Sequence, residues 1–197
     1  IIIATGAREK EIPSLPLDRE TVITSREALE TRKIPSKVVI VGGGATGAEF
    51  AHIYNTYGSE VTIVELMPRI VPLEDEEVSQ QLEKIFKKRG IHIMTSAGVQ
   101  GIDVDNGKAT VRAMIDSSES LIECDKVLVA VGVQGNIENI GLEDVGIATD
   151  RNFITVDDNM LTSVDRIYAI GDVTGKMLLA HVASAQGVTA VESMAGL

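Results

Sequence analysis

Three glycines follow an apolar run in a spacing that suits the binding of phosphate groups. Gly42, Gly44 and Gly47 form the pattern Gly-x-Gly-x-x-Gly directly after Val38–Val41. The pattern alone is weak, because glycines at such a point can serve only the turn between a strand and a helix. Its context strengthens it, since Glu65 ends the next apolar run at about the 20-residue distance that a dinucleotide-binding fingerprint requires. The sequence therefore predicts a dinucleotide site at this turn.

Each residue of the fingerprint has an expected physical role. Gly42 allows the tight turn, Gly44 lets the backbone approach a pyrophosphate, and Gly47 lets the helix pack closely on the strand. The free N–H groups at the start of that helix then point at the phosphates, and no lysine is needed. Glu65 would accept hydrogen bonds from the adenine-ribose hydroxyls and repel a 2′-phosphate, which favours NAD(H) over NADP(H). The alternative is a glutamate that is merely solvated.

Hydrophobic periodicity places the fingerprint among alternating strands and helices. Strands are predicted over residues 38–41, 61–64 and 91–94. The helices between them carry apolar residues at helical spacing, namely Phe50, Ile53, Tyr54 and Tyr57 in the first and Val78, Leu82, Ile85 and Phe86 in the second. This order of elements predicts an α/β fold with a doubly wound parallel sheet of the Rossmann type.

The pattern changes between residues 98 and 123. Short alternating strands are predicted over 101–104, 109–115 and 120–123, with a hairpin turn at Asp105-Asn106-Gly107, and together they form an antiparallel meander. The run 127–131 then ends on Gly132, as a buried parallel strand does before a ligand crevice. Further elements are expected as short strands at 153–156 and 167–170 and as a helix from about residue 180.

The composition argues against several classes of function. With 18 Lys and Arg residues against 29 Asp and Glu residues, the net charge is −11, and no basic stripe is present to hold nucleic acid or an anionic membrane. The longest uncharged stretch, residues 177–191, is too short and too polar to cross a bilayer. The N-terminus lacks the basic region and apolar core of a secretory signal. We therefore expect no nucleic-acid or membrane partner, and a location in the cytoplasm or an organelle matrix.

Cys124 is the single cysteine, and this limits redox and metal chemistry. One thiol cannot close an internal disulfide, form a two-cysteine redox motif or build a multi-cysteine zinc site. Its acidic neighbours raise the pKa of a thiol, so a structural cysteine is expected. The acidic run Glu74–Glu77 is a candidate cation site, but carboxylates at the start of a helix complement its dipole, and solvated charges are the preferred interpretation. No metal is expected.

Beyond these motifs, the chain resembles the flavoprotein disulfide reductases, or class I pyridine nucleotide-disulfide oxidoreductases, and among them most closely the dihydrolipoamide dehydrogenases. The segments that carry the resemblance are Ala4–Ala7, Thr24–Leu29, Gly42–Glu49, Val64–Glu65, Val129–Gly132, Tyr168–Asp172, Leu178–His181 and Gln186–Gly187. Each segment is a modest signal, but their order and spacing together are specific. The resemblance implies an oxidoreductase that uses FAD and NAD.

The resemblance assigns residues to each cofactor. Those implied for NAD are Gly42, Gly43, Gly44, Ala45, Thr46, Gly47, Glu49, Glu65, Val99 and Gly132, with Val99 towards the adenine and Gly132 towards the nicotinamide. Those implied for FAD are Thr5, Gly6, Ala7, Asp172, Leu178, Leu179, Ala180 and His181. Without the resemblance, Glu49 is a surface glutamate, Asp172 a cap or turn residue, and His181 a capping or packing histidine. No residue of this chain is expected to be catalytic.

The same resemblance divides the chain into parts. Residues 25–152 are expected to form an NAD-binding domain, and residues 1–24 and 153–197 to belong to a partial FAD-binding domain. The family's glycine fingerprint for FAD, its redox-active cysteine pair and its C-terminal domain are absent, so the chain looks like an internal fragment. We expect it to be inactive alone and to retain no FAD. A second departure is Val133–Asn136, where many relatives carry arginines before the asparagine.

For the full-length enzyme, the resemblance implies that dihydrolipoamide reduces a protein disulfide, which passes electrons to FAD and then, as hydride, to NAD⁺. Lipoyl domains of 2-oxoacid dehydrogenase complexes are the implied partners, and a homodimer is the implied assembly. Two alternatives stay open. One is an NADH-dependent relative, such as an NADH oxidase, a transhydrogenase or a mercuric reductase. The other is a stand-alone NAD-binding module.

Overall fold

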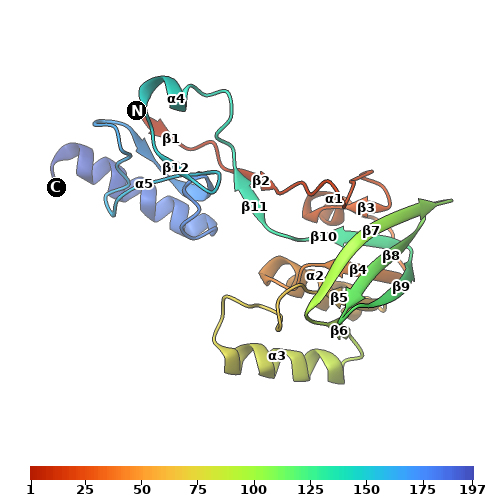
Figure 1. Ribbon diagram of the computed structural model, residues 1–197. Coiled ribbons are helices and arrows are strands. Elements are labelled where there is room, and N and C mark those ends of the chain that lie inside the picture. The colour runs from red at the N-terminus through yellow and green to blue at the C-terminus, as the bar shows by residue number, and fades with distance from the viewer. The chain divides into compact units, whose positions relative to one another are not determined.

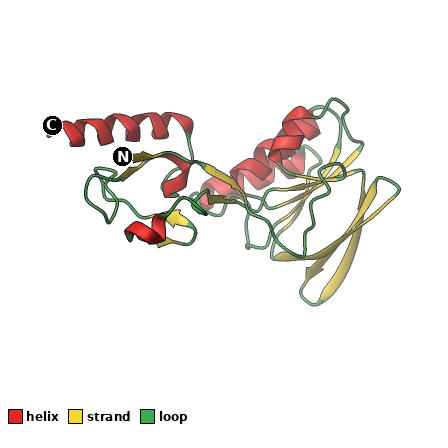
Figure 2. Ribbon diagram, turned by 90° about the horizontal axis from the view of Figure 1, so that it is seen from above, coloured by secondary structure: helices red, strands yellow, loops and turns green.

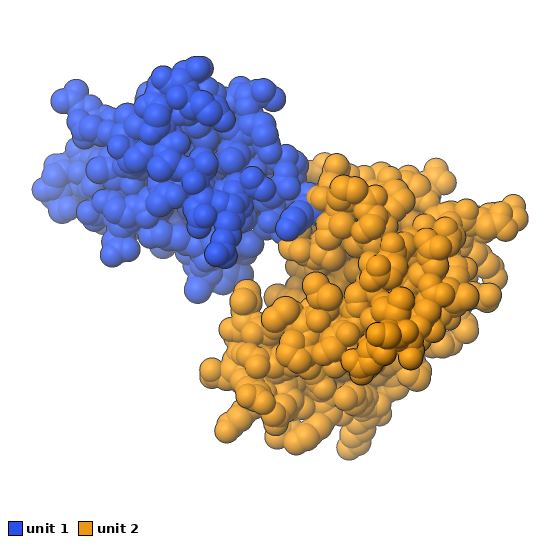
Figure 3. Space-filling model, in the orientation of Figure 1, with its two compact units in different colours: residues 1–10, 133–197 blue, residues 11–132 orange.

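The computed structural model describes residues 1–197, which form two compact units (Figure 1 and Figure 3). The larger unit is Glu11–Gly132, and the smaller unit combines Ile1–Lys10 with Val133–Leu197. The larger unit is therefore one continuous segment, and the smaller unit is formed by the segments before and after it in the sequence. No helix in either unit is long and apolar enough to cross a membrane.

A parallel sheet of five strands forms the centre of the larger unit. In spatial order the strands are β3 (Val22–Ile23), β10 (Lys126–Val129), β4 (Lys37–Val41), β5 (Glu60–Val64) and β6 (His92–Met94). Every neighbouring pair is parallel, and Ile40 of β4 lies opposite Ile63 of β5. The β-branched residues in these strands favour extended backbone, and burial on both faces explains their nearly continuous apolar runs. The predicted parallel sheet is confirmed.

The two faces of this sheet are covered by different elements. Helices α1 (Ser25–Glu30), α2 (Ala45–Thr56) and α3 (Glu76–Lys88) pack on one face. The other face is covered by the antiparallel meander of β7 (Ala97–Asp105), β8 (Lys108–Ile115) and β9 (Ser118–Cys124), as Figure 2 shows. Side-chain alternation sends Ile40 towards the helices and Val39 towards the meander. The meander thus occupies the face where a fully doubly wound sheet carries its second layer of helices.

The buried faces of α2 and α3 are narrower than the spacing of their apolar residues predicts. Phe50 and Tyr54 of α2 and Phe86 of α3 are buried. The exposed members of the predicted stripes are Ile53 and Tyr57 in α2 and Val78 and Ile85 in α3. In α2 the small residues Gly47 and Ala51 are also buried, so the helix lies against the sheet along the line of residues 47, 50, 51 and 54. Residues 53 and 57 are rotated away from that line.

The hairpin turn of the meander is confirmed. Asp105 and Lys108 pair across a two-residue loop, and Asn106 and Gly107 both have positive φ angles, 48° and 74°. A type I′ turn requires this conformation at both central residues, and Asn-Gly is its preferred sequence.

The smaller unit consists of short elements around a small apolar core. Its strands are β1 (Ile2–Ile3), β2 (Ala7–Glu9), β11 (Val133–Gly135), β12 (Thr149–Asp150), β13 (Phe153–Ile154) and β14 (Tyr168–Ala169). Its helices are α4 (Leu142–Val145), the 3₁₀-helix η1 (Gly171–Thr174) and α5 (Ala180–Ala195). Ile154, Ala169 and Val173 are fully buried at its centre. The two short strands and the helix expected here are present, although the strands are shorter than predicted.

The compact units divide the chain at different points from the expected domains. Residues 11–24 belong to the larger unit, because β3 pairs with β10 and Leu15 is buried against the meander face of the sheet. Residues 133–152 belong to the smaller unit, because β11 pairs with β2. Both segments are therefore assigned by pairings between strands that are distant in sequence.

A carboxylate stabilises the junction between β3 and α1. Oε2 of Glu27 accepts hydrogen bonds from the backbone N–H and the hydroxyl of Thr24, at 2.9 and 2.7 Å, and Oε1 is 3.0 Å from Arg19 Nη1. Partial burial raises the pKa of Glu27, but the hydrogen bonds from Thr24 and Arg19 outweigh burial and lower the pKa to about 2. The charged form of Glu27 therefore stabilises the folded state.

We expect Glu27→Gln to lower the free energy of unfolding by ~1–2 kcal/mol at pH 7. The pKa of glutamate in an unfolded chain is about 4.3. The stabilisation is thus fully present above that pH and is lost as the pH falls through the folded-state value of about 2. Chemical denaturation of both proteins between pH 2 and pH 7 measures the difference, with the exposed Glu30→Gln on the same helix as control. A gap that does not narrow in acid would contradict the prediction.

Candidate nucleotide-binding site

The carboxyl ends of β4 and β10 define a topological switch point. From β4 the chain proceeds through β5 to β6 on one side, while β10 and β3 lie on the other side. In open α/β sheets, ligands bind in the crevice where the strand order reverses, outside the carboxyl ends of the strands. Gly42 follows β4 at this edge, and Gly132 follows β10. The predicted glycine turn therefore lies where the topology favours a ligand.

Gly42 is required at the switch point for two reasons. Its φ angle is +103°, in the region that favours glycine. In addition, a Cβ atom at this position would overlap the carbonyl oxygen of Ala130, whose own N–H donates to the Val41 carbonyl at 2.8 Å. The turn after β4 and the chain after β10 therefore approach each other with no room for a side chain.

The other two glycines of the fingerprint have contrasting surroundings. A Cβ atom on Gly47 would overlap the carbonyl oxygen of Gly42 and would lie 3.4 Å from Ile40 Cγ2, so helix α2 packs directly on the turn. A Cβ atom on Gly44, the N-cap of α2, would meet no atom within 4 Å. Close packing at Gly47 and open space at Gly44 are the conditions that the predicted roles require.

Glu65 is not a solvated glutamate, because its residue is only 7% exposed. Its Oε2 accepts a hydrogen bond from the Gly43 N–H at 2.5 Å, and its Oε1 accepts one from the Met67 N–H at 2.7 Å. Each carboxylate oxygen has a second lone pair, so both oxygens retain capacity for a ribose hydroxyl. The carboxylate thus links the end of β5 to the glycine turn.

Gly43 differs from the other residues that were predicted to bind NAD. Its N–H donates to Glu65, and its carbonyl accepts a hydrogen bond from the Val71 N–H at 2.7 Å. Both polar groups of this residue are therefore engaged within the protein. The N–H groups at the start of α2, at Gly44, Ala45, Thr46 and Gly47, have no partner within the helix and can serve as donors to a phosphate.

The remaining residues of the NAD set lie in the same unit. Val99 is half-buried on β7, at the irregularity that precedes Gly101. Gly132 is exposed, with a φ angle of +99°. Glu49 is exposed on α2, so both its assigned role and the alternative of a surface glutamate stay open.

The residues that were assigned to FAD all lie in the smaller unit, separate from the NAD set. Thr5 and Gly6 are bound there by Asn136. The Thr5 hydroxyl donates to the Asn136 carbonyl at 2.7 Å, Asn136 Nδ2 donates to the Thr5 carbonyl at 2.9 Å, and the Asn136 N–H donates to the Gly6 carbonyl at 2.9 Å. Ala7 follows on β2 and pairs with Gly135. Asn136 belongs to the Val133–Asn136 segment that departs from the family pattern, and its contact with Thr5 was not predicted.

Asp172 lies half-buried in η1. The turn is ordered by Gln186, whose role was not predicted from the sequence. Gln186 of α5 is only 7% exposed, and its Oε1 accepts a hydrogen bond from the Gly171 N–H at 2.6 Å. The only sequence signal for this role is that Gln186–Gly187 is one of the segments that carry the family resemblance. Leu178–His181 lies exposed where α5 begins, so His181 is not a packing residue.

Cys124 and the acidic run are not part of this site. Cys124 is buried, and burial is the main cause that raises the pKa of its thiol to about 11, as expected of a structural cysteine. No group of three or more His, Cys, Asp or Glu residues is arranged to hold a metal.

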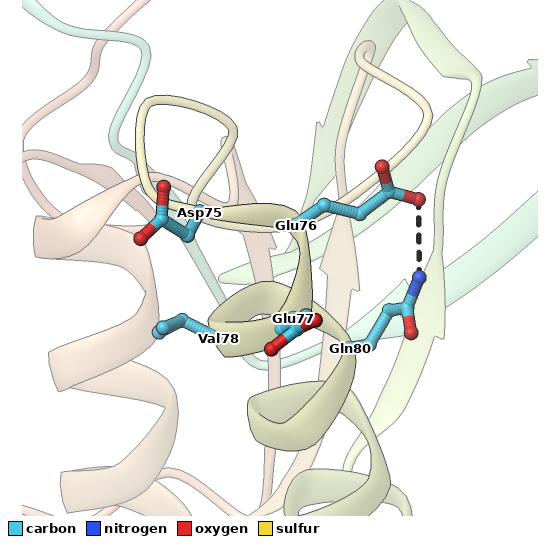
Figure 4. Close-up of a pocket in the computed structure, with 5 residues that line it drawn as sticks. All are labelled: Asp75, Glu76, Glu77, Val78 and Gln80. Atoms are coloured by element: carbon cyan, nitrogen blue, oxygen red, sulfur yellow. Dashed lines mark hydrogen bonds between the residues drawn. The ribbon is translucent and has the colours of Figure 1, made fainter.

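A pocket of about 620 Å³ lies at the start of α3 (Figure 4). Its lining residues are Asp75, Glu76, Glu77, Val78 and Gln80, and Glu76 Oε1 accepts a hydrogen bond from Gln80 Nε2 at 3.0 Å. Three carboxylates would repel the phosphates of a nucleotide. The glycine turn, rather than this pocket, is therefore the candidate nucleotide site.

Comparisons with known protein families, sequences and structures all lead to one family of oxidoreductases. The sequence profile of the pyridine nucleotide-disulphide oxidoreductases matches residues 1–187. Dihydrolipoyl dehydrogenases of Mycobacterium leprae and Chlorobaculum tepidum are 47% and 46% identical over 197 residues, which is 100% of this chain and 42% of each relative. The crystal structure of LpdA from Mycobacterium tuberculosis has a TM-score of 0.90 and 33% identity, covering 99% of this chain and 42% of LpdA. The flavoprotein disulfide reductase RclA from Escherichia coli has a TM-score of 0.85 and 29% identity, covering 98% and 44%.

The fold and the glycine turn define an α/β protein with a candidate nucleotide site at the switch point of its parallel sheet. The chain belongs to the pyridine nucleotide-disulphide oxidoreductase family, and its curated relatives are dihydrolipoyl dehydrogenases. It spans about 42% of the length of those relatives.

Proposed function

We propose that the chain is the NAD-binding portion of a dihydrolipoyl dehydrogenase, together with part of its FAD-binding domain. The observation that carries the proposal is the glycine turn at the switch point, with an open N-cap at Gly44 and a buried carboxylate at Glu65. The first turn of α2 would hold the pyrophosphate, and Glu65 would bind the adenine ribose. The proposal rests on this geometry and on identities of 46–47% to dihydrolipoyl dehydrogenases.

The larger unit would bind and orient the nicotinamide nucleotide, while NAD⁺ itself supplies the hydride acceptor. In the smaller unit, Asn136 orders the Thr5–Gly6 segment, and Gln186 orders the turn that carries Asp172. Thr5, Gly6 and Asp172 would contact FAD. The chain holds one glycine fingerprint and one cysteine. We therefore propose that it neither retains FAD nor turns over dihydrolipoamide on its own. Lipoyl domains as partners and a homodimer belong to the same proposal for the whole enzyme.

We expect the chain to bind NADH at least about tenfold more tightly than NADPH. The carboxylate of Glu65 would repel a 2′-phosphate, and Arg69, the first basic residue after Glu65 in the sequence, donates from Nη2 to the Pro72 carbonyl at 3.2 Å. Calorimetric titration of both nucleotides measures the ratio. The exposed Glu76→Gln controls for general charge repulsion, since it removes one carboxylate outside the glycine turn. Equal or tighter binding of NADPH would contradict the assignment of Glu65.

A further inference from the structure

The peptide of Gly43 is enclosed on both sides, although the fingerprint leaves this position open to any residue. Glu65 accepts from its N–H and Val71 donates to its carbonyl. A Cβ atom at Gly43 would lie 2.9 Å from Ile70 Cγ2 and 3.2 Å from Glu65 Cβ. The segment that contains Ile70 and Val71 therefore fixes the middle of the glycine turn directly.

Helix α3 holds that segment in turn. The Ser79 hydroxyl donates to the Ile70 carbonyl at 2.7 Å, and the Ile70 N–H donates to Glu83 Oε1 at 3.5 Å. Ser79 and Glu83 are four residues apart and lie on one face of the helix. Ser79 and Ile70 are both fully buried, so water does not compete for the contact between them.

The backbone of Val71 is in an unusual conformation. Its φ angle is +40°, which β-branched residues rarely adopt, and the residue is almost fully buried. Such strain persists where surrounding contacts over-determine the conformation, and it is concentrated at functional sites. Here the conformation directs the Val71 N–H at the Gly43 carbonyl.

We propose that Ser79 is a positioning residue for the dinucleotide site, acting through Ile70 and Val71 on the peptide of Gly43. The proposal rests on the proposed NAD-binding function of the glycine turn. Ser79 touches no part of the expected nucleotide site. It fixes the turn that precedes α2, and so the direction of the N–H groups that would meet the pyrophosphate.

Ser59 provides a matched control within the same unit. It is also buried, and its hydroxyl donates to the Pro35 carbonyl at 2.6 Å. It lies directly before β5, at the opposite edge of the sheet from the glycine turn. Ser59→Ala and Ser79→Ala therefore remove the same kind of buried contact, but only one of them supports the turn.

Calorimetric titration of NADH and thermal unfolding of the 197-residue chain test the proposal. We expect both variants to lower the melting temperature, and Ser79→Ala alone to raise the Kd for NADH by about fivefold. Unchanged affinity in Ser79→Ala, or an equal rise in Ser59→Ala, would overturn the positioning role while leaving the proposed function intact. A wild-type chain that binds no NADH would overturn both.

A second pair of variants keeps the test decisive if Ser79→Ala does not fold. Gly43→Ala places a methyl group against Ile70 Cγ2, and we expect it to raise the Kd for NADH by about tenfold. Adding Ile70→Leu moves the branch of the side chain away from its Cβ, at nearly constant volume. The double variant is expected to bind NADH more tightly than Gly43→Ala. If the double variant binds NADH more weakly than Gly43→Ala, by the sum of the effects of the two single substitutions, Ile70 does not act on the turn.

Discussion

Gly47→Ala is expected to abolish measurable NADH binding and to lower the free energy of unfolding of the larger unit by ~2–4 kcal/mol. The added methyl group would overlap the carbonyl oxygen of Gly42. That carbonyl cannot move freely, because the Gly42 N–H donates to the Val64 carbonyl at 2.9 Å and the turn is closely packed against Ala130. Helix α2 must therefore shift away from the sheet, and the N–H groups of its first turn shift with it.

Gly187→Ala is the matched control for this substitution. Gly187 also lies within a helix, α5, but a Cβ atom there would meet Ile170 Cδ1 at an ordinary contact distance of 3.6 Å. Alanine has the higher helix propensity, so stability should be unchanged or raised by ~0.5–1 kcal/mol. Denaturant unfolding and NADH titration compare the two variants. If Gly47→Ala behaves like Gly187→Ala, the close packing of α2 on the glycine turn has no functional consequence.

The features predicted correctly from the sequence are those that local patterns encode. The parallel strands are short apolar runs, and the meander turn is an Asn-Gly pair. In both cases, neighbours in sequence determine the environment. The burial of Glu65 was not predicted, although the residue ends a strand that is covered on both faces.

The features that were missed depend on contacts between distant segments. Asn136 binds Thr5 across 131 positions of the sequence, and β2 pairs with β11 over a similar separation, so neither contact has a local signal. Gln186 has a signal only through resemblance, because its partner, the Gly171 N–H, is a backbone group. Ser79 is an ordinary helix residue in sequence, and its role depends on a loop whose path no periodicity determines.

Glu65→Ala is expected to destabilise the larger unit by ~2–4 kcal/mol. The substitution leaves the N–H groups of Gly43 and Met67 without their carboxylate acceptor, the first at a buried position and the second at a partly buried one. A buried donor left without its partner costs ~1–3 kcal/mol, which applies to the Gly43 N–H, and the partly buried Met67 N–H adds a smaller cost. NADH affinity should also fall, by ~1–3 kcal/mol, through lost contacts to the ribose hydroxyls.

Glu65→Gln separates the structural role of the carboxylate from its role in recognition. Glutamine keeps one oxygen acceptor but places an NH₂ group against the second backbone donor, so stability should lie between those of wild type and Glu65→Ala. Its neutral side chain no longer repels a 2′-phosphate, and we expect the preference for NADH over NADPH to fall towards one. Titration of both nucleotides against both variants, with denaturant unfolding in parallel, measures these effects. If Glu65→Gln loses stability but keeps the full preference for NADH, the carboxylate serves only to hold the glycine turn, and specificity must come from the space around Val99 and the first turn of α2.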